Sequence, residues 1–158
     1  MGFEVKRYHD ISTGHRVVGH EGKCRHLHGH NYRIHFICVA DEGGLDAQGR
    51  VIDFGEIKER LCMWVEHAWD HKFLAWERDP VARMMVASMN QFCADKECAK
   101  SVDLLLESIV TVPFNPTAEN MARHLVQVVG PRELFGTGIT LIRVDIDETA
   151  KCQASFSL

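Results

Sequence analysis

The residues of this 158-residue chain that could do chemistry are crowded near its start. Seven of the ten histidines lie within residues 9–35, and Cys24 stands four residues before His28. In an extended chain, residues two apart project to the same face, so His28 and His30 can bind one ion together. Gly29 between them leaves the backbone free to bend toward that ion. The spacing therefore predicts a metal site rather than a set of independent surface histidines.

A third ligand has to come from another element. Residues 3–17 alternate like a strand, and His15 falls on the same face as Ile11. Three histidines with an open fourth position are typical of a catalytic zinc site, whereas a structural site is closed by four protein ligands. His15 is the best placed third ligand. The spacing also leaves four alternatives: His9, His20, His26 and His35.

Cys24 has two possible roles. As a fourth ligand it would close the site and make the zinc structural. As a free thiolate, with a pKa lowered by the metal and by Lys23 and Arg25, it would be a base or a nucleophile. The spacing does not decide between these roles.

Two carboxylates further along the chain could serve the same site. Asp70 can orient the imidazole of His71 for proton transfer, although a cationic histidine at a helix end is the more common explanation. Glu148 continues the apolar side of a strand that contains Ile146. A carboxylate there is costly unless it meets donors, and a turn residue beside Thr149 is the alternative.

Periodicity predicts the elements that must position these residues. Strands are expected at 3–17, 32–40, 142–147 and 152–156, with helices beginning at Asp53 and Thr117. This order predicts an α+β fold, in which one four-stranded antiparallel sheet has two helices on one face. Residues 75–113, which contain a methionine-rich helical stripe, are expected to be a partly helical insert in a single domain spanning 1–158.

Composition excludes several classes of function. The chain is 46% hydrophobic and 25% charged, with no apolar run long enough for a membrane span and no signal-peptide pattern, so we expect a cytoplasmic protein. Residues 1–35 carry six Lys and Arg against three Asp and Glu, although the whole chain has a charge of −4. A basic histidine-rich end suits a small anionic substrate better than nucleic acid, since no basic helix is present.

Taken together, these motifs resemble the 6-pyruvoyl-tetrahydropterin synthase / 6-carboxy-tetrahydropterin synthase family, and they occur in the family's order. His-Gly-His-Asn-Tyr with an upstream Cys is the most specific of them, whereas Pro-Thr-x-Glu-Asn alone is weak. The matching segments are Ser12–Arg16, Cys24–Tyr32, Val51–Lys58, Asp70–Leu74, Pro116–Asn120 and Asp147–Thr149.

The resemblance implies a tunnelling fold (T-fold) that assembles around a central barrel, commonly as a hexamer of two trimers. It implies zinc (Zn2+) as the cofactor, bound by His15, His28 and His30. The insert at 75–113 departs from the short connection of minimal bacterial members.

The resemblance also implies roles for the remaining residues. Cys24 becomes the proton-abstracting base rather than a ligand, and Asp70 with His71 becomes a proton relay supplied across a subunit interface. Glu148 becomes the anchor of the pterin, because its two oxygens match the 2-amino group and the ring N–H. The pocket is supported by Thr117 and Glu119, and the triphosphate is met by Lys23, Arg25 and His26.

The implied activity is that of a lyase. It converts 7,8-dihydroneopterin triphosphate to 6-carboxy-5,6,7,8-tetrahydropterin with release of acetaldehyde and triphosphate, in the queuosine (7-deazapurine) pathway. The three-residue gap between Cys24 and His28 and the Val51–Phe54 segment resemble this bacterial branch. The biopterin-type 6-pyruvoyl-tetrahydropterin synthase, which usually has a longer gap, and a non-catalytic zinc-containing pterin-binding module are the alternatives.

Overall fold

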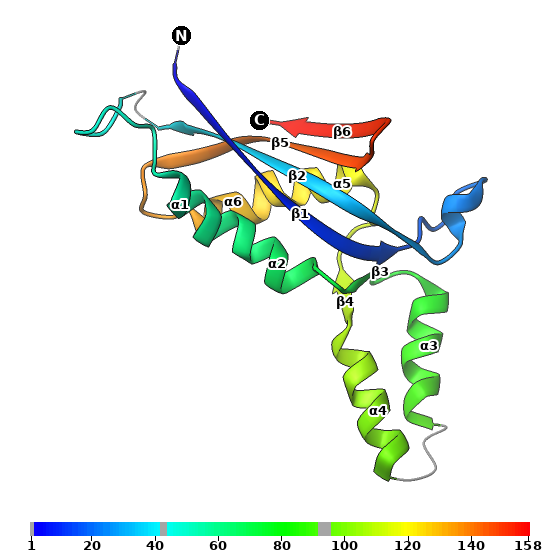
Figure 1. The fold of residues 1–158 in the computed structure, drawn as a ribbon. Coiled ribbons are helices and arrows are strands. Elements are labelled where there is room, and N and C mark those ends of the chain that lie inside the picture. Colours follow the sequence, from blue (N-terminus) through cyan, green and yellow to red (C-terminus); the bar gives the residue numbers. More distant parts are fainter. Residues whose placement is uncertain (1, 42–43, 92–95) are drawn as a thin grey trace.

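A single curved sheet runs through the molecule, and two runs of helix cover one of its faces (Figure 1). The computed structural model describes residues 2–41, 44–91 and 96–158. Within these residues the sheet has six strands, in the order β4-β3-β1-β2-β5-β6. They are β1 (Glu4–His15), β2 (His28–Ala40), β3 (Phe73–Trp76), β4 (Ile109–Val112), β5 (Ile139–Thr149) and β6 (Cys152–Ser157).

The sequence predicts the antiparallel strands β1, β2, β5 and β6, but the expected total of four is wrong. The two additional strands, β3 and β4, are parallel to their neighbours and come largely from the expected insert. β3 joins the end of β1 through the pairs Gly14–Phe73 and His15–Leu74. In the expected four-stranded sheet β1 would be an edge strand with unpaired backbone groups. Instead, β3 pairs with the last two residues of β1, and β4 pairs with β3.

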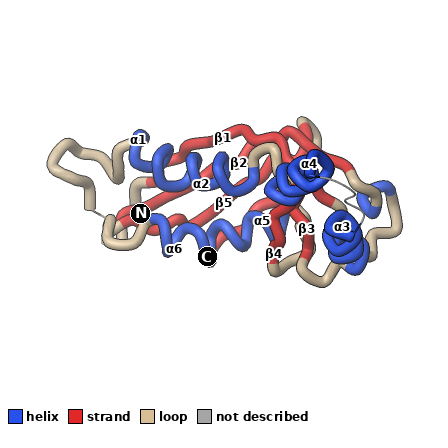
Figure 2. The backbone as a smooth tube through the Cα atoms, turned by 90° about the horizontal axis from the view of Figure 1, so that it is seen from below, coloured by secondary structure: helices blue, strands red, loops and turns tan. Residues whose placement is uncertain are grey.

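The two runs of helix lie across the same face of the sheet, which Figure 2 shows from below. Asp53 caps the first run by accepting a hydrogen bond from the Gly55 N–H, and Thr117 caps the second by accepting one from the Asn120 N–H. Both helix starts agree with the sequence prediction. The runs are α1 (Phe54–Ile57), η2 (Lys58–Cys62) and α2 (Met63–Trp69), then α5 (Ala118–His124), η3 (Leu125–Val129) and α6 (Gly130–Glu133).

The hydrophobic core fills the space between these helices and the sheet. Tyr32 and Phe36 of β2 are buried there against Trp69 of α2 and Met121 of α5. Each such side chain stabilises the fold by about 1.5–3 kcal/mol, so β2 is held firmly between the two runs of helix. Because β2 begins at His28, the core also fixes the strand that presents two of the three candidate ligands.

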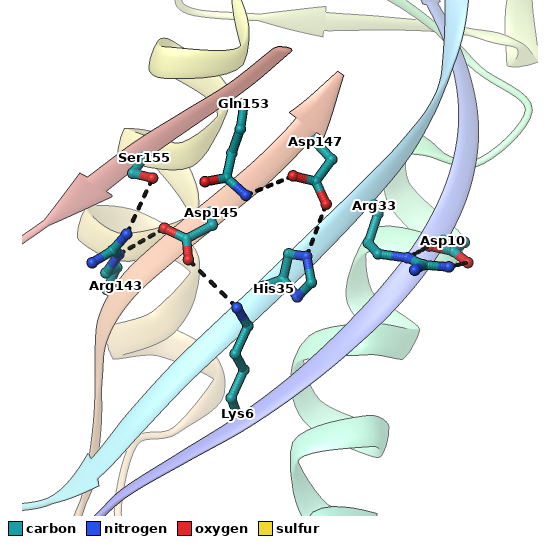
Figure 3. A network of polar contacts seen from close by, with 9 residues as sticks. All are labelled: Lys6, Asp10, Arg33, His35, Arg143, Asp145, Asp147, Gln153 and Ser155. Carbon is teal, nitrogen blue, oxygen red and sulfur yellow. Dashed lines mark hydrogen bonds and ion pairs between the residues drawn. The ribbon is translucent and has the colours of Figure 1, made fainter. Parts of the chain in front are cut away.

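The opposite face of the sheet is polar, and its charged side chains pair with one another (Figure 3). Asp145 accepts a 2.6 Å hydrogen bond from Arg143 and lies 3.7 Å from the Lys6 ammonium. His35 lies 2.9 Å from a carboxylate oxygen of Asp147. Because these paired charges can remain in contact with water, this face of the sheet stays at the surface. The apolar core therefore forms on the helix face alone.

The insert between β3 and β4 is a helical hairpin that projects away from the sheet (Figure 1). Its helices are α3 (Pro80–Gln91) and α4 (Lys96–Glu107). Asp79 caps α3 by accepting a 2.9 Å hydrogen bond from the Val81 N–H, and its other oxygen lies 3.2 Å from Nε of Arg16. Like every other helix that the structure describes, these two fall short of the length and apolar character of a membrane span.

Candidate metal centre and adjoining cavity

Three histidines meet where β1 ends and β2 begins. The antiparallel register places His15 opposite His28 and Thr13 opposite His30. One ring nitrogen of each histidine lies within 4.8 Å of the others, and no other such group of potential ligands occurs in the described part of the chain. The histidine cluster, as we call His15, His28 and His30, is thus a product of strand pairing as much as of sequence spacing.

A glycine allows the two strands to approach at this point. A Cβ atom added to Gly29 would lie 2.9 Å from the carbonyl oxygen of Thr13, which is closer than real contacts allow. Gly29 also faces Gly14 in the register. The close approach brings the rings together, with centroids 4.5 Å apart for His15 and His28 and 5.0 Å apart for His28 and His30.

Hydrogen bonds orient the rings of the cluster. Nδ1 of His15 donates to the carbonyl of Pro116 at 2.6 Å, and Nδ1 of His28 donates to the carbonyl of His26 at 2.7 Å. A neutral imidazole that donates through Nδ1 leaves Nε2 as a lone pair, which is the form that binds a metal. Nε2 of His28 and Nε2 of His30 are both buried without a hydrogen-bond partner. An ion at this point would supply the missing partner.

Electrostatics favour the metal-binding form of these rings. Burial lowers the pKa of His15, and the neighbouring rings lower it further. Burial also lowers the pKa of His30. Neutral imidazole is the ligating form, so the site does not have to remove protons from these two rings at neutral pH. Three imidazole nitrogens within 4.8 Å of one another are a donor set that fits a zinc ion.

The other histidines near the start of the chain are occupied elsewhere or exposed. His9 is 2.7 Å from Glu66, His35 pairs with Asp147, and Nδ1 of His20 accepts a hydrogen bond from the Gly22 N–H. His26 is exposed. None of these four belongs to the group that can share an ion. Of the ligand sets left open by the spacing, the structure brings together the set built on His15.

A cavity of about 260 Å³ adjoins the cluster and gathers four of the predicted site residues, Cys24, Thr117, Glu119 and Glu148. Cys24 is absent from the group that can share an ion, so the geometry separates it from the three histidines as a ligand. His20, Cys152 and Gln153 also line the cavity, and the sequence analysis assigned them no role there. His20 lies in a loop, and Cys152 and Gln153 begin β6, where alternation predicts a strand but assigns no chemistry to either side chain.

Glu148 reaches from β5 toward the cluster. Its Oε1 lies 3.6 Å from Nε2 of His30 and 3.8 Å from Nε2 of His15. The hydroxyl of Tyr32 lies 3.1 Å from Nε2 of His15 and donates to Oε1 of Glu148 at 3.3 Å. Burial raises the pKa of Tyr32, and the Glu148 charge raises it further, so the phenol keeps its proton. The parity argument thus placed Glu148 on the correct side of its strand.

The segment before α5 supports His15, a role that sequence reasoning missed. The side chain of Asn115 forms a two-way pair with the backbone of Val18, accepting from its N–H at 3.0 Å and donating to its C=O at 2.9 Å. Asn120 donates in turn to the carbonyl of Asn115 at 3.0 Å. These bonds hold the carbonyl of Pro116 against His15. The available signal was the Pro116–Asn120 motif, whose Thr117 and Glu119 the resemblance assigns to the pocket rather than to support of a metal ligand; Asn115 lies just outside that motif.

Asp70 and His71 lie beside β1, outside the cavity that contains Cys24. The Asp70 carboxylate accepts from the Ser12 N–H at 2.7 Å, and the His71 N–H donates to the Ser12 carbonyl at 2.7 Å, so the pair runs along the outer edge of β1. Neither residue lines the cavity that contains Cys24. Both border a larger opening of about 890 Å³ on the polar face.

The Asp70–His71 pair is itself well defined. Nδ1 of His71 donates to Asp70 at 2.6 Å, and the His71 backbone has a positive φ of 53°, which is uncommon for a residue with a side chain. Burial opposes ionisation of Asp70, but the bonds from Ser12 and His71 keep its pKa below the usual range. His71 is 82% exposed, so its ring points to solvent with an ionised carboxylate behind it.

The residues assigned to a triphosphate, Lys23, Arg25 and His26, are not among those that line the cavity. Lys23 and Arg25 flank Cys24 in η1 (Lys23–Arg25) and are exposed. Arg25 donates to the carbonyl of Glu21 at 2.9 Å. Their assignment to a triphosphate therefore stays a prediction that rests on charge and on sequence adjacency to Cys24.

An α+β fold that places three converging histidines beside a cavity with two carboxylates is typical of an enzyme with a metal centre. A family model described as 6-pyruvoyl tetrahydropterin synthase matches residues 4–157. A 6-carboxy-5,6,7,8-tetrahydropterin synthase of Rickettsia felis is 30% identical over 144 residues, which cover 90% of this chain and 91% of the relative. The chain belongs to the 6-pyruvoyl tetrahydropterin synthase family.

Solved structures agree on the fold. An uncharacterized protein from Wolinella succinogenes superposes with a TM-score of 0.81 at 24% identity, covering 98% of this chain and 97% of its own. The 6-pyruvoyl tetrahydropterin synthase of Caenorhabditis elegans superposes with a TM-score of 0.63 at 20% identity, covering 99% and 95%. The fold is therefore the T-fold that the sequence predicts, with six strands in place of four.

Proposed function

We propose that the protein is a zinc-dependent lyase that converts 7,8-dihydroneopterin triphosphate to 6-carboxy-5,6,7,8-tetrahydropterin, releasing acetaldehyde and triphosphate. The observation that carries the proposal is the cavity beside the histidine cluster, which gathers Cys24 and Glu148. The Rickettsia relative, which is similar over nine-tenths of both chains, has the name of this activity. The reaction would serve the queuosine (7-deazapurine) pathway in the cytoplasm.

Four residues that line the cavity have parts in the proposed reaction. Glu148 accepts hydrogen bonds from the 2-amino group and ring N–H of the pterin, a bidentate match for its carboxylate. Thr117 and Glu119 border the same cavity and complete its polar wall. Cys24 removes a proton from the substrate side chain as a thiolate. A zinc ion on the histidine cluster, when bound, would polarise the side-chain oxygens of the substrate.

The position of Asp70 and His71 supports assembly from several copies. In one chain this pair lies beside β1, whereas Cys24 and Glu148 line a cavity beside β6, an edge strand that β2 and β5 separate from β1. A second copy that docks its β1 edge against β6 of the first would bring the pair toward Cys24. We therefore propose a homo-oligomer, with a hexamer of two trimers as the expected form, in which the partner supplies the proton relay.

The products identify the reaction. We expect purified zinc-loaded protein to form 6-carboxytetrahydropterin and acetaldehyde from 7,8-dihydroneopterin triphosphate, as detected by mass spectrometry. Formation of 6-pyruvoyltetrahydropterin without acetaldehyde would assign the biopterin-type activity instead. Retention of zinc and pterin with unchanged substrate would identify a non-catalytic binding module.

Variants separate the roles of the thiol and of the relay. Cys24→Ala should retain zinc and lose turnover, with Cys98→Ala in α4 as the matched control; loss of zinc from Cys24→Ala would make the thiol a ligand. Cys24→Ala and His71→Ala should each be inactive alone, and mixed oligomers of the two should regain activity. If mixed oligomers form but have no activity, the hypothesis that two subunits share the active site is wrong.

A further inference from the structure

Tyr32 has a buried hydroxyl beside the histidine cluster that the proposed reaction does not use. It follows His30 by two positions in β2, so its side chain points to the same side as His28 and His30. It is 1% exposed, and its ring packs edge-on against His15 and His30 at centroid distances of 5.9 and 5.4 Å. A phenylalanine would fill the same space, so packing alone does not account for the hydroxyl.

The hydroxyl has two neighbours. It lies 3.1 Å from Nε2 of His15 and 3.3 Å from Oε1 of Glu148. Nδ1 of His15 donates to Pro116, so Nε2 is the nitrogen that the histidine cluster offers to a metal. A nitrogen engaged with a metal has no lone pair left for the hydroxyl. Glu148 is then the acceptor that remains for Tyr32.

Glu148 in turn depends on Tyr32. Among the described residues, Tyr32 is the one side chain that donates a hydrogen bond to Glu148. No Lys or Arg pairs with this carboxylate in the described structure, and the nitrogens of His15 and His30 lie beyond hydrogen-bond distance at 3.8 and 3.6 Å. Glu148 is 28% exposed near the end of β5, so its side chain would otherwise be free to choose among rotamers.

We propose that Tyr32 is a positioning residue, whose hydroxyl holds Oε1 of Glu148 at the edge of the histidine cluster and presents the carboxylate to the pterin. This inference rests on the proposed function, because it assigns Glu148 to pterin recognition. A carboxylate oxygen has two lone-pair directions, so Oε1 can accept from Tyr32 and still face the ligand. Fixing the carboxylate before binding removes the cost of ordering it in the complex.

The test is Tyr32→Phe, which removes one oxygen and keeps the ring. Zinc content and melting temperature should match those of the wild type, because the histidines and the packing are unchanged. The affinity for pterin (2-amino-4-oxopteridine), followed by its fluorescence, should fall about tenfold, the range of a hydrogen bond to a charged group. In turnover, KM should rise by about the same factor while kcat stays within about threefold. Tyr8→Phe, the other tyrosine, is 51% exposed on the polar face and should change nothing.

A double-mutant cycle shows whether Tyr32 acts through Glu148. In a Glu148→Gln background the bond from Tyr32 reaches a neutral group and weakens, so Tyr32→Phe should then cost less than about threefold in pterin affinity. Equal losses in both backgrounds would overturn the proposal, as would unchanged pterin affinity in Tyr32→Phe. If the wild-type protein with full zinc bound no pterin, the proposed function would fail and the role of Tyr32 with it.

Discussion

The histidine cluster and the α3–α4 hairpin contact two consecutive residues of the chain, yet they differ in how far their side chains are buried and held by hydrogen bonds. His15 belongs to the cluster, and the next residue, Arg16, pairs with Asp79 at the base of the hairpin. His15 is 1% exposed and is held by a backbone carbonyl, whereas α4 has no buried residue among its twelve.

The difference shows where this fold requires precision. A metal site works only if its ligands are held in place before the ion arrives, so strand pairing, a glycine contact and hydrogen bonds all constrain the same three rings. The described part of the hairpin carries no such ligands, and the contact that the hairpin needs is the one at its base, between Asp79 and Arg16. Substitutions should therefore be costly at the cluster, moderate at the junction and tolerated on the hairpin surface.

The largest effect is expected from His28→Ala. Removing one of three ligands leaves two nitrogens, and we expect zinc affinity to fall by about a hundredfold or more, a loss at least as large as that caused by removing a supporting residue. Competition with a chromogenic chelator measures it. His26→Ala is the matched control, since His26 is exposed two residues away and contacts the cluster only through its carbonyl. Equal loss in both variants would contradict the assigned ligand set.

Gly29→Ala should come next. Its new Cβ would press on the carbonyl of Thr13 at 2.9 Å, and a backbone atom cannot yield as a flexible side chain can. We expect the free energy of unfolding to fall by about 2–3 kcal/mol, measured by denaturant titration, together with weaker zinc binding. Gly44→Ala, where nothing lies within 4 Å, is the control. Wild-type stability for Gly29→Ala would show that the strands need no close approach.

Asp79→Asn tests the junction between the two regions. Asp79 is 1% exposed and lies 3.2 Å from Arg16, so an uncharged amide would leave the guanidinium without its partner charge. We expect a loss of about 1–2 kcal/mol and faster amide hydrogen exchange in α3, with zinc content retained. The exposed Glu77→Gln is the control. Unchanged exchange in α3 would mean that other contacts hold the hairpin.

The smallest effect is expected from Leu104→Ser in α4. Leu104 is 60% exposed, so its replacement removes little buried apolar surface. The free energy of unfolding should change by less than about 0.5 kcal/mol, and zinc content should not change. Leu74→Ser in β3, which is 0% exposed, provides the contrast and should cost several times more. A large effect at Leu104 would remove the distinction between the two regions.

Local patterns predicted much of the fold and part of the candidate site. Alternation identified β1, β2, β5 and β6, and side-chain chemistry located the helix starts at Asp53 and Thr117. β3 and β4 were not counted among the strands of the sheet, because each has only four residues and a run that short shows no periodicity. Parallel pairing with β1 depends on a partner that a local window does not contain.

The sequence by itself determined that His28 and His30 share a face, because side-chain direction in a strand alternates with a period of two. It also placed Glu148 on the inward side of β5, by the same rule. Only the tertiary structure decided that His15 is the third member of the cluster and that Tyr32 meets Glu148, 116 positions away. It likewise placed Cys24 apart from Asp70 and His71. Those relations arise from strand register and packing, which join residues that no local spacing connects.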